Sequence, residues 1–156
     1  MKDKYDMVGK KIEEFSLPNS RGEKTSINEF IGKNIIVALL RGINWPYCRA
    51  QVRSFAKDIE QFKQLNTVIY PILVDKQKNA IKMEQKYAKE KFPIFYDENK
   101  DVVKRLHQEF KILKFGRMPA LLIVDKEGVI KFAYYSNSMS DILKNKELFK
   151  VLENLN

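Results

Sequence analysis

The sequence has a single cysteine, Cys48, so no disulfide can form within one chain. It also lacks an apolar run of transmembrane length, because its longest runs, 35–40 and 120–124, are only long enough for strands. Residues 1–5 carry no apolar core of a signal peptide. These absences predict a cytoplasmic protein without a membrane partner.

Long blocks of like charge are absent as well, although the net charge is +9, with 29 basic against 20 acidic residues. The basic residues are mostly lysines, interleaved with glutamate and aspartate along the whole chain. This pattern is typical of a solvated, lysine-rich surface. Since no nucleic-acid recognition motif is visible, we expect no nucleic-acid partner.

The length of 156 residues fits one domain, 1–156, and we find no internal repeat. Strand and helix patterns alternate along it. We expect strands at 34–40, 67–75 and 92–96, helices at about 48–64, 78–91 and from Asp101 to Phe110, a hairpin at 120–136, and a C-terminal helix from Ser140 or Asp141. This order predicts an α/β fold whose mainly parallel sheet is covered on both faces, with antiparallel strands added by the hairpin.

Three local signals refine this prediction. Ser26, with Glu29 three residues later, predicts a capping box at the start of a short helix. Residues 126–128, Lys-Glu-Gly, predict the tight turn of the hairpin. Pro71 interrupts the second buried strand, so we expect an irregularity there.

Cys48 lies where the first buried strand pattern has ended and a helical pattern begins. The free N–H groups and dipole of a helix N-terminus stabilise a thiolate, and the nearby cations Arg41, Arg49 and Arg53 lower a thiol pKa in the same way. We therefore interpret Cys48 as a nucleophile. The alternative is a buried apolar cysteine without chemistry, since cysteine is among the most buried residue types.

The segment 41–49, Arg-Gly-Ile-Asn-Trp-Pro-Tyr-Cys-Arg, resembles the cysteine loop of the peroxiredoxin-like proteins of the alkyl hydroperoxide reductase/thiol-specific antioxidant family, the redoxins. Cys48 matches the peroxidatic cysteine and Gln51 the residue three places after it. The likeness extends from about Val8 to Leu155. It implies a thioredoxin-like fold, with a central mixed sheet between helices and a C-terminal hairpin and helix.

Two positions depart from the family pattern. Trp45 stands where the family has a threonine that holds the peroxide. The family's catalytic arginine lies six residues before the hairpin aspartate, where this chain has Pro119, and the nearest arginine is Arg117. Met118-Pro119 is instead similar to the cis-proline segment of thioredoxin-type proteins.

The resemblance implies a single-cysteine thiol peroxidase for hydrogen peroxide or alkyl hydroperoxides, without cofactor or metal. The Cys48 thiolate is expected to form a sulfenic acid. The backbone N–H of Cys48 and the guanidinium groups of Arg41 or Arg117 are candidate donors to the leaving oxygen, and Trp45, Gln51, Met118 and Pro119 are candidate substrate-binding residues. With no resolving cysteine, the reductant is an external thiol, a thioredoxin-like protein or Cys48 of a second subunit. The resemblance also allows a homodimer.

Each candidate has a structural alternative. Arg41 and Arg117 can be solvated charges, Trp45 a hydrophobic lid over the helix start, and Gln51 a brace for the loop. Tyr47 and Phe115 are expected to pack rather than react. The only histidine, His107, is expected to be structural, with a papain-like Cys48–His107 pair as the minor alternative.

Two other functions remain open at this point. One is a monothiol thiol–disulfide oxidoreductase that docks an extended chain at Met118-Pro119. The other is a binding or redox-sensing module without catalysis, for which a buried sulfur with an ordinary thiol pKa would be the mark.

Overall fold

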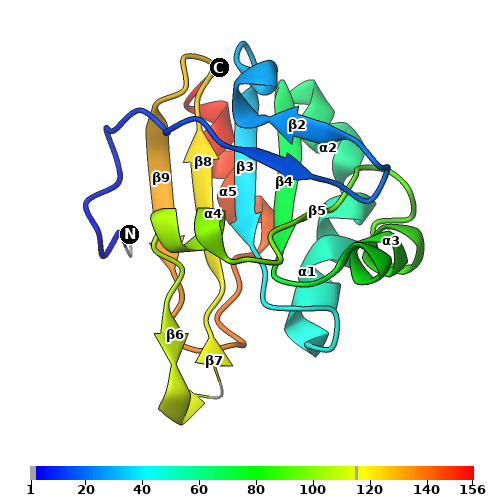
Figure 1. Cartoon of the computed structure of the whole chain (residues 1–156). Helices are drawn as coiled ribbons and strands as arrows, with labels where there is room; N and C mark the ends of the chain where they lie inside the picture. The colour runs from blue at the N-terminus through cyan, green and yellow to red at the C-terminus, as the bar shows by residue number, and fades with distance from the viewer. Residues whose placement is uncertain (1–2, 115) are drawn as a thin grey trace.

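The computed structural model describes residues 3–114 and 116–156. Its centre is a mixed five-stranded sheet (Figure 1) in the order β5 (Phe95–Tyr96), β4 (Thr67–Leu73), β3 (Asn34–Leu39), β8 (Ala120–Val124) and β9 (Ile130–Tyr135). β3, β4 and β5 are parallel, whereas β8 is antiparallel to both β3 and β9. Parallel pairing thus covers only half of the sheet, because the hairpin strand β8 lies directly beside β3.

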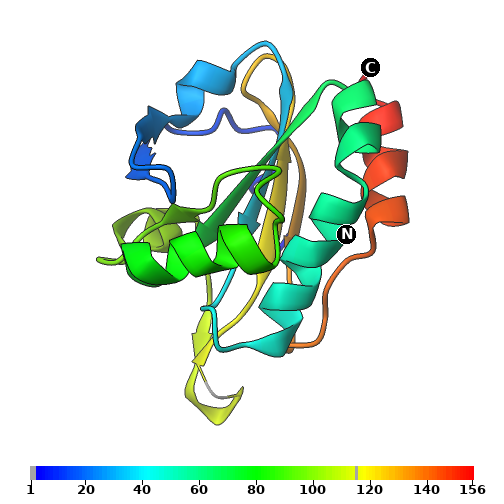
Figure 2. The same cartoon turned by 90° about the vertical axis from the view of Figure 1, so that its right-hand side faces the viewer.

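Helices cover both faces of this sheet, as predicted (Figure 2). One face carries α1 (Pro46–Lys57), α2 (Ile59–Gln64) and α5 (Asn145–Glu153). The other carries β1 (Ser16–Pro18), β2 (Lys24–Ser26), the 3-10 helix η1 (Ile27–Phe30) and α4 (Asp101–Arg105). α3 (Gln77–Lys86) lies beside the β4–β5 edge.

The continuous apolar run of β3 is explained by burial on both faces. Ile36 and Ala38 belong to the core under α1 and α5, whereas Ile35 and Val37 belong to the core on the other face. Since successive side chains of a strand point to opposite faces, a strand between two cores needs an apolar residue at every position. β3 is therefore fixed in the centre, and its end sets the position of the residues that follow.

The local signals mostly agree with the structure. The capping box at Ser26 and Glu29 is confirmed, although the helix it starts is 3-10. The hairpin is also confirmed, with Gly128 at φ +85° in its turn. Pro71 lies in a continuous strand instead of an irregular one. The backbone N position of Pro71 points toward β5, and the pairing of β4 with β5 begins only at Ile72. No carbonyl of β5 therefore loses a hydrogen bond because Pro71 has no N–H.

Several element boundaries differ from the prediction. The first long helix is divided at Asp58 into α1 and α2. α3 ends at Lys86, and Lys89 and Glu90 have positive φ, which a right-handed helix cannot accommodate. α4 begins at Asp101 but is short and ends at Arg105 instead of Phe110. α5 begins at Asn145, after Lys144 as N-cap.

One element was not predicted at all. Residues predicted to lie at the end of a helix instead start a separate small hairpin formed by β6 (Phe110–Lys111), the 3-10 turn η2 (Ile112–Lys114) and β7 (Gly116–Arg117). It projects beyond the end of the sheet near the start of α1 (Figure 1), and we call residues 110–117 the arm. Within the described ranges, no helix is long and apolar enough to cross a membrane.

Candidate active site

Cys48 is the third residue of α1, in the first turn of the helix that follows β3. Trp45 is the N-cap but makes no capping hydrogen bond with its side chain, and Pro46 is the first helical residue. Proline suits this position because its missing N–H would have no partner there. The predicted place of the cysteine at a strand-to-helix junction is confirmed.

The sulfur of Cys48 is buried, with only 1% of the residue exposed. It belongs to the apolar core that includes Leu40, Ile43 and Val52. The backbone N–H of Arg41 donates to Sγ across 3.2 Å. The site therefore combines an apolar surrounding with a hydrogen-bond donor aimed at the sulfur.

Burial raises the pKa of the Cys48 thiol, whereas the backbone N–H groups of Arg41 and Gly42 and the charges of Arg41 and Arg49 lower it. Burial is the largest of these effects. The predicted lowering of the pKa is therefore wrong for this closed arrangement, although the predicted cationic contribution is present. The closed site favours the neutral thiol, and exposure of the sulfur would remove the effect that opposes the thiolate.

Arg41 is buried, not solvated, with 4% of the residue exposed. Its guanidinium lies 3.5 Å from the ring centroid of Trp45. Burial lowers the pKa of Arg41, while a negative charge on Cys48 raises it. A cation held in this way over an aromatic face is positioned to stabilise charge at the sulfur.

Trp45 is half-buried and covers the loop, which agrees with its interpretation as a lid. A Cβ added at Gly42 would lie 3.4 Å from the indole Cδ1. This is an ordinary van der Waals distance, so the indole lies against the loop at Gly42. The guanidinium of Arg41 lies over the same indole. Trp45 therefore both covers the loop and holds the positive charge next to the site.

Arg117 is placed differently. It lies on β7 with its guanidinium 5.7 Å from the Phe110 ring centroid. Burial lowers the pKa of Arg117 and the charge of Asp97 raises it. The cations whose charge acts on Cys48 are Arg41 and Arg49. Of the two predicted arginines, the structure brings Arg41 to the sulfur and not Arg117.

Arg49 was recognised in the sequence as a nearby cation but not as a site residue. Its Nε donates to the Ile43 carbonyl across 2.6 Å, which ties the first turn of α1 to the loop. Asp75, which follows the end of β4, binds the same loop, because its Oδ2 accepts from the Ile43 N–H at 3.3 Å. The signal for Arg49 was its position next to the cysteine, whereas nothing in the sequence pointed to Asp75.

The backbone N–H of Cys48 donates to the Trp45 carbonyl at 3.1 Å. The predicted donor to the leaving oxygen is therefore already engaged in the helix start. The N–H groups of Arg41 and Gly42 are the backbone donors that act on the sulfur instead. Because these donors are backbone groups, no residue type in the sequence indicated their role.

Gln51 is buried on α1, where it lines a groove of about 210 Å³ together with Tyr47 and residues 142–145. Its role as a substrate-binding residue or as a brace for the loop stays a prediction.

Tyr47 is 46% exposed, so it lies at the surface of this groove and not in the core. Phe115 lies outside the described residues.

Met118 is buried, and the Met118–Pro119 peptide bond is trans, so the likeness to a cis-proline segment does not hold. The segment nevertheless lies next to the cysteine loop. Buried Gln108 donates through Nε2 to the carbonyls of Leu40, at 3.0 Å, and of Met118, at 3.1 Å. Gln108 was missed because a glutamine between two elements carries no distinctive signal.

His107 takes no part in this site. Its ring stacks on that of Tyr5 with 4.8 Å between centroids, and it lines a separate cavity with Arg105 and Lys10. The papain-like pair is therefore not formed. Over residues 3–114 and 116–156, no group of three or more His, Cys, Asp or Glu residues could hold a metal ion.

A family model described as "AhpC/TSA family" matches residues 8–133. A protein named "Peroxiredoxin 2" from Sulfurisphaera tokodaii is 28% identical over 138 residues, which cover 85% of this chain and 65% of the relative. A "Peroxiredoxin" from Hyperthermus butylicus is 27% identical over 155 residues, covering 95% of this chain and 66% of that protein. The chain thus spans about two thirds of the length of these relatives.

Solved structures show the same fold. A crystal structure named "Peroxidoxin BcpB" from Mycobacterium tuberculosis has a TM-score of 0.83 at 14% identity and covers 96% of this chain and 98% of that one. The mitochondrial 2-Cys peroxiredoxin of Plasmodium falciparum has a TM-score of 0.78 at 20% identity, covering 94% and 92%. The predicted thioredoxin-like α/β fold with a mixed central sheet is confirmed.

Proposed function

Because the chain belongs to the AhpC/TSA family, we propose that it is a single-cysteine thiol peroxidase that reduces hydrogen peroxide or alkyl hydroperoxides at Cys48. The observation that carries the proposal is the set of groups around Sγ. Two backbone N–H groups and the guanidinium charges of Arg41 and Arg49 all stabilise negative charge there. A cysteine without chemistry needs none of them.

The reaction begins with the thiolate of Cys48. Its sulfur attacks the terminal oxygen of the peroxide, an S–O bond forms and the O–O bond breaks. The leaving oxygen takes a proton and departs as water or an alcohol, and Cys48 becomes a sulfenic acid. Arg41 is the group best placed to stabilise the charge that develops in this step, because it is buried beside the sulfur.

The sulfur must be uncovered before it can react, because only 1% of Cys48 is exposed. In this proposal the start of α1 is the segment that moves. Its N-cap Trp45 makes no side-chain capping bond, and a missing cap weakens a helix start by about 1 kcal/mol. Opening there hydrates the sulfur and removes the burial that raises the Cys48 pKa.

The sulfenic acid needs a reductant from outside these 156 residues, since they hold no second cysteine. A thiol attacks the sulfenic sulfur, water leaves and a mixed disulfide forms. A second thiol then releases Cys48 as a thiolate. Small thiols and thioredoxin-like proteins are both suitable.

One observation favours a second candidate function. A buried sulfur whose pKa is raised is also what a binding module with an unreactive cysteine would show. In that case Cys48 would react with peroxide no faster than an ordinary thiol. The two functions therefore differ in a measurable rate and in turnover.

Intact mass spectrometry tests the proposal directly. Reduced protein is treated with one equivalent of hydrogen peroxide or of an alkyl hydroperoxide, and the Cys48→Ser variant serves as the control. We expect addition of one oxygen to the wild type alone, followed by return to the starting mass and continued peroxide consumption when a thiol is added. Oxidation without return, or none at all, would support the non-catalytic module.

A further inference from the structure

The arm is the most exposed apolar feature of the described chain. Phe110 is 62% exposed, Ile112 80% and Leu113 95%. Single exposed apolar residues are common on protein surfaces. Three large ones within four positions, at the end of a projecting hairpin, indicate a contact surface.

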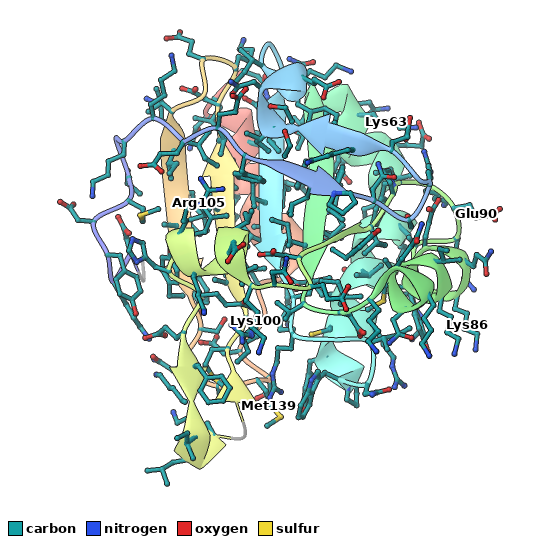
Figure 3. All side chains as sticks on the ribbon, viewed as in Figure 1. Lys63, Lys86, Glu90, Lys100, Arg105 and Met139 are labelled. Atoms are coloured by element: carbon teal, nitrogen blue, oxygen red, sulfur yellow. The ribbon has the colours of Figure 1, made fainter. Side chains whose placement is uncertain are left out.

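The arm is held in an extended position by its own contacts. β6 and β7 pair through Phe110 with Arg117 and through Lys111 with Gly116, apart from the main sheet. At the base, the Met118 N–H donates to the Glu109 carbonyl at 2.8 Å. Figure 3 shows the side chains at the end of the arm projecting away from the body of the protein. The apolar side chains are thus presented to the surroundings instead of folding back onto the core.

The chemistry of the segment is amphipathic and cationic. Its eight residues, Phe-Lys-Ile-Leu-Lys-Phe-Gly-Arg, include four apolar and three basic residues and no acidic one. The acid at its base, Glu109, already lies 3.1 Å from Lys4 and 3.8 Å from Lys111. Asp97 is the acid whose charge acts on Arg117. The end of the arm therefore combines exposed aliphatic side chains with positive charge.

We propose that the arm docks this protein on the surface of an anionic lipid bilayer, with Ile112 and Leu113 inserted among the acyl chains. Lysines beside an apolar tip are attracted to anionic headgroups while the tip is buried below them. No membrane-spanning helix is needed for this kind of contact. The proposal departs from the sequence-based expectation of no membrane partner, which rested on the absence of a spanning run and of a signal peptide.

A protein partner fits the arm less well. Its three exposed apolar side chains offer a few hundred Å², whereas a stable protein interface buries roughly 800 Å² on each side. Packing of two arms in a dimer would also bring Lys111 and Lys114 of both copies together in a chain of net charge +9. An anionic bilayer instead neutralises these charges.

Docking would bring the candidate site to the membrane surface. Gly116 belongs to the arm, and a Cβ added to it would lie 3.9 Å from Nη2 of Arg41. The cysteine loop thus adjoins the base of the arm. The docking proposal does not depend on peroxidase activity, but if both hold, hydroperoxides of membrane lipids are the substrates closest to Cys48.

Vesicle flotation tests this inference without any activity measurement. The full chain is mixed with vesicles of phosphatidylcholine alone or of phosphatidylcholine with phosphatidylglycerol. We expect flotation with the anionic vesicles only and a decline as salt is raised, because salt screens the attraction. Absence of flotation with anionic vesicles, or equal flotation with neutral ones, would overturn the proposal.

Two variants locate the contact. Ile112→Asp/Leu113→Asp is expected to lower the partition coefficient at least about tenfold, and Lys111→Gln/Lys114→Gln to lower it several-fold. The matched controls are Ile31→Asp, an exposed isoleucine beside the opposite end of β8, and Lys146→Gln/Lys150→Gln on α5. Wild-type flotation by the arm variants would contradict docking through the arm.

Sedimentation equilibrium separates docking from self-association. We expect the same mass for the wild type and for Ile112→Asp/Leu113→Asp. A concentration-dependent dimer that this variant abolishes, without vesicle binding by the wild type, would show that the arm binds a second copy and would overturn the proposal.

Discussion

Replacing Arg41 is expected to slow peroxide reduction far more than replacing Arg117. The sulfur is 1% exposed, so water screens the neighbouring Arg41 charge only weakly. Loss of one preorganised group that stabilises developing charge costs about 3 kcal/mol in the transition state. At about 1.4 kcal/mol for each tenfold change, this corresponds to roughly a hundredfold lower rate constant.

Three variants test this reasoning in the same rapid-mixing assay. Arg41→Gln removes the charge and is expected to show the full loss. Arg41→Lys keeps the charge but loses the planar stack over Trp45, which lies 3.5 Å away, so its rate should be intermediate. Arg117→Gln should react nearly as fast as the wild type, since its guanidinium lies over Phe110.

Stability must be measured beside the rate. A desolvated contact between an arginine and an indole contributes about 2 kcal/mol, so Arg41→Gln is expected to lower the unfolding temperature as well. The rate comparison is therefore made well below the transition of each variant. Equal rates for Arg41→Gln and wild type, or a larger loss in Arg117→Gln, would refute the assignment of Arg41.

Two other predictions concern stability. Burial raises the pKa of Cys48 in the folded state. The stabilising contribution of the neutral thiol is therefore complete below the pKa of the unfolded state, about 8.5, and is lost as pH rises through the pKa of the folded state. In urea unfolding, the wild type should lose stability relative to Cys48→Ala at alkaline pH, and a constant difference between the two would contradict this. Gln108→Met should lower the free energy of unfolding by about 2–4 kcal/mol, because the buried carbonyls of Leu40 and Met118 lose their donor. Exposed Gln61→Met is its control, and equal losses would count against the role of Gln108.

The parts of the fold predicted from the sequence are those encoded by short-range patterns. The unbroken apolar run of β3 indicated burial on two faces, and Gly128 marked the hairpin turn by allowing a positive φ. The strand-to-helix position of Cys48 followed from the same patterns. These features depend on neighbours in the chain, so periodicity is sufficient to detect them.

The features that were missed depend on tertiary contacts. The sign of the Cys48 pKa shift is set by how completely the core covers the sulfur, which no motif reports. Gln108 acquires its role only when β3 and Met118 lie side by side. Phe110, the first residue of the arm, was assigned to a helix because it continued the apolar spacing of Val102, Val103 and Leu106, although α4 ends at Arg105.

The rate constant of Cys48 with hydrogen peroxide tests most directly whether Cys48 is a peroxidatic thiol. Trp45, the only tryptophan, lies at the N-cap of the helix that carries the thiol, so its fluorescence can follow oxidation in a stopped-flow instrument. We expect a signal that is absent in Cys48→Ser and a second-order rate constant far above that of a free thiol. A rate constant no greater than that of a free thiol would contradict the peroxidase assignment.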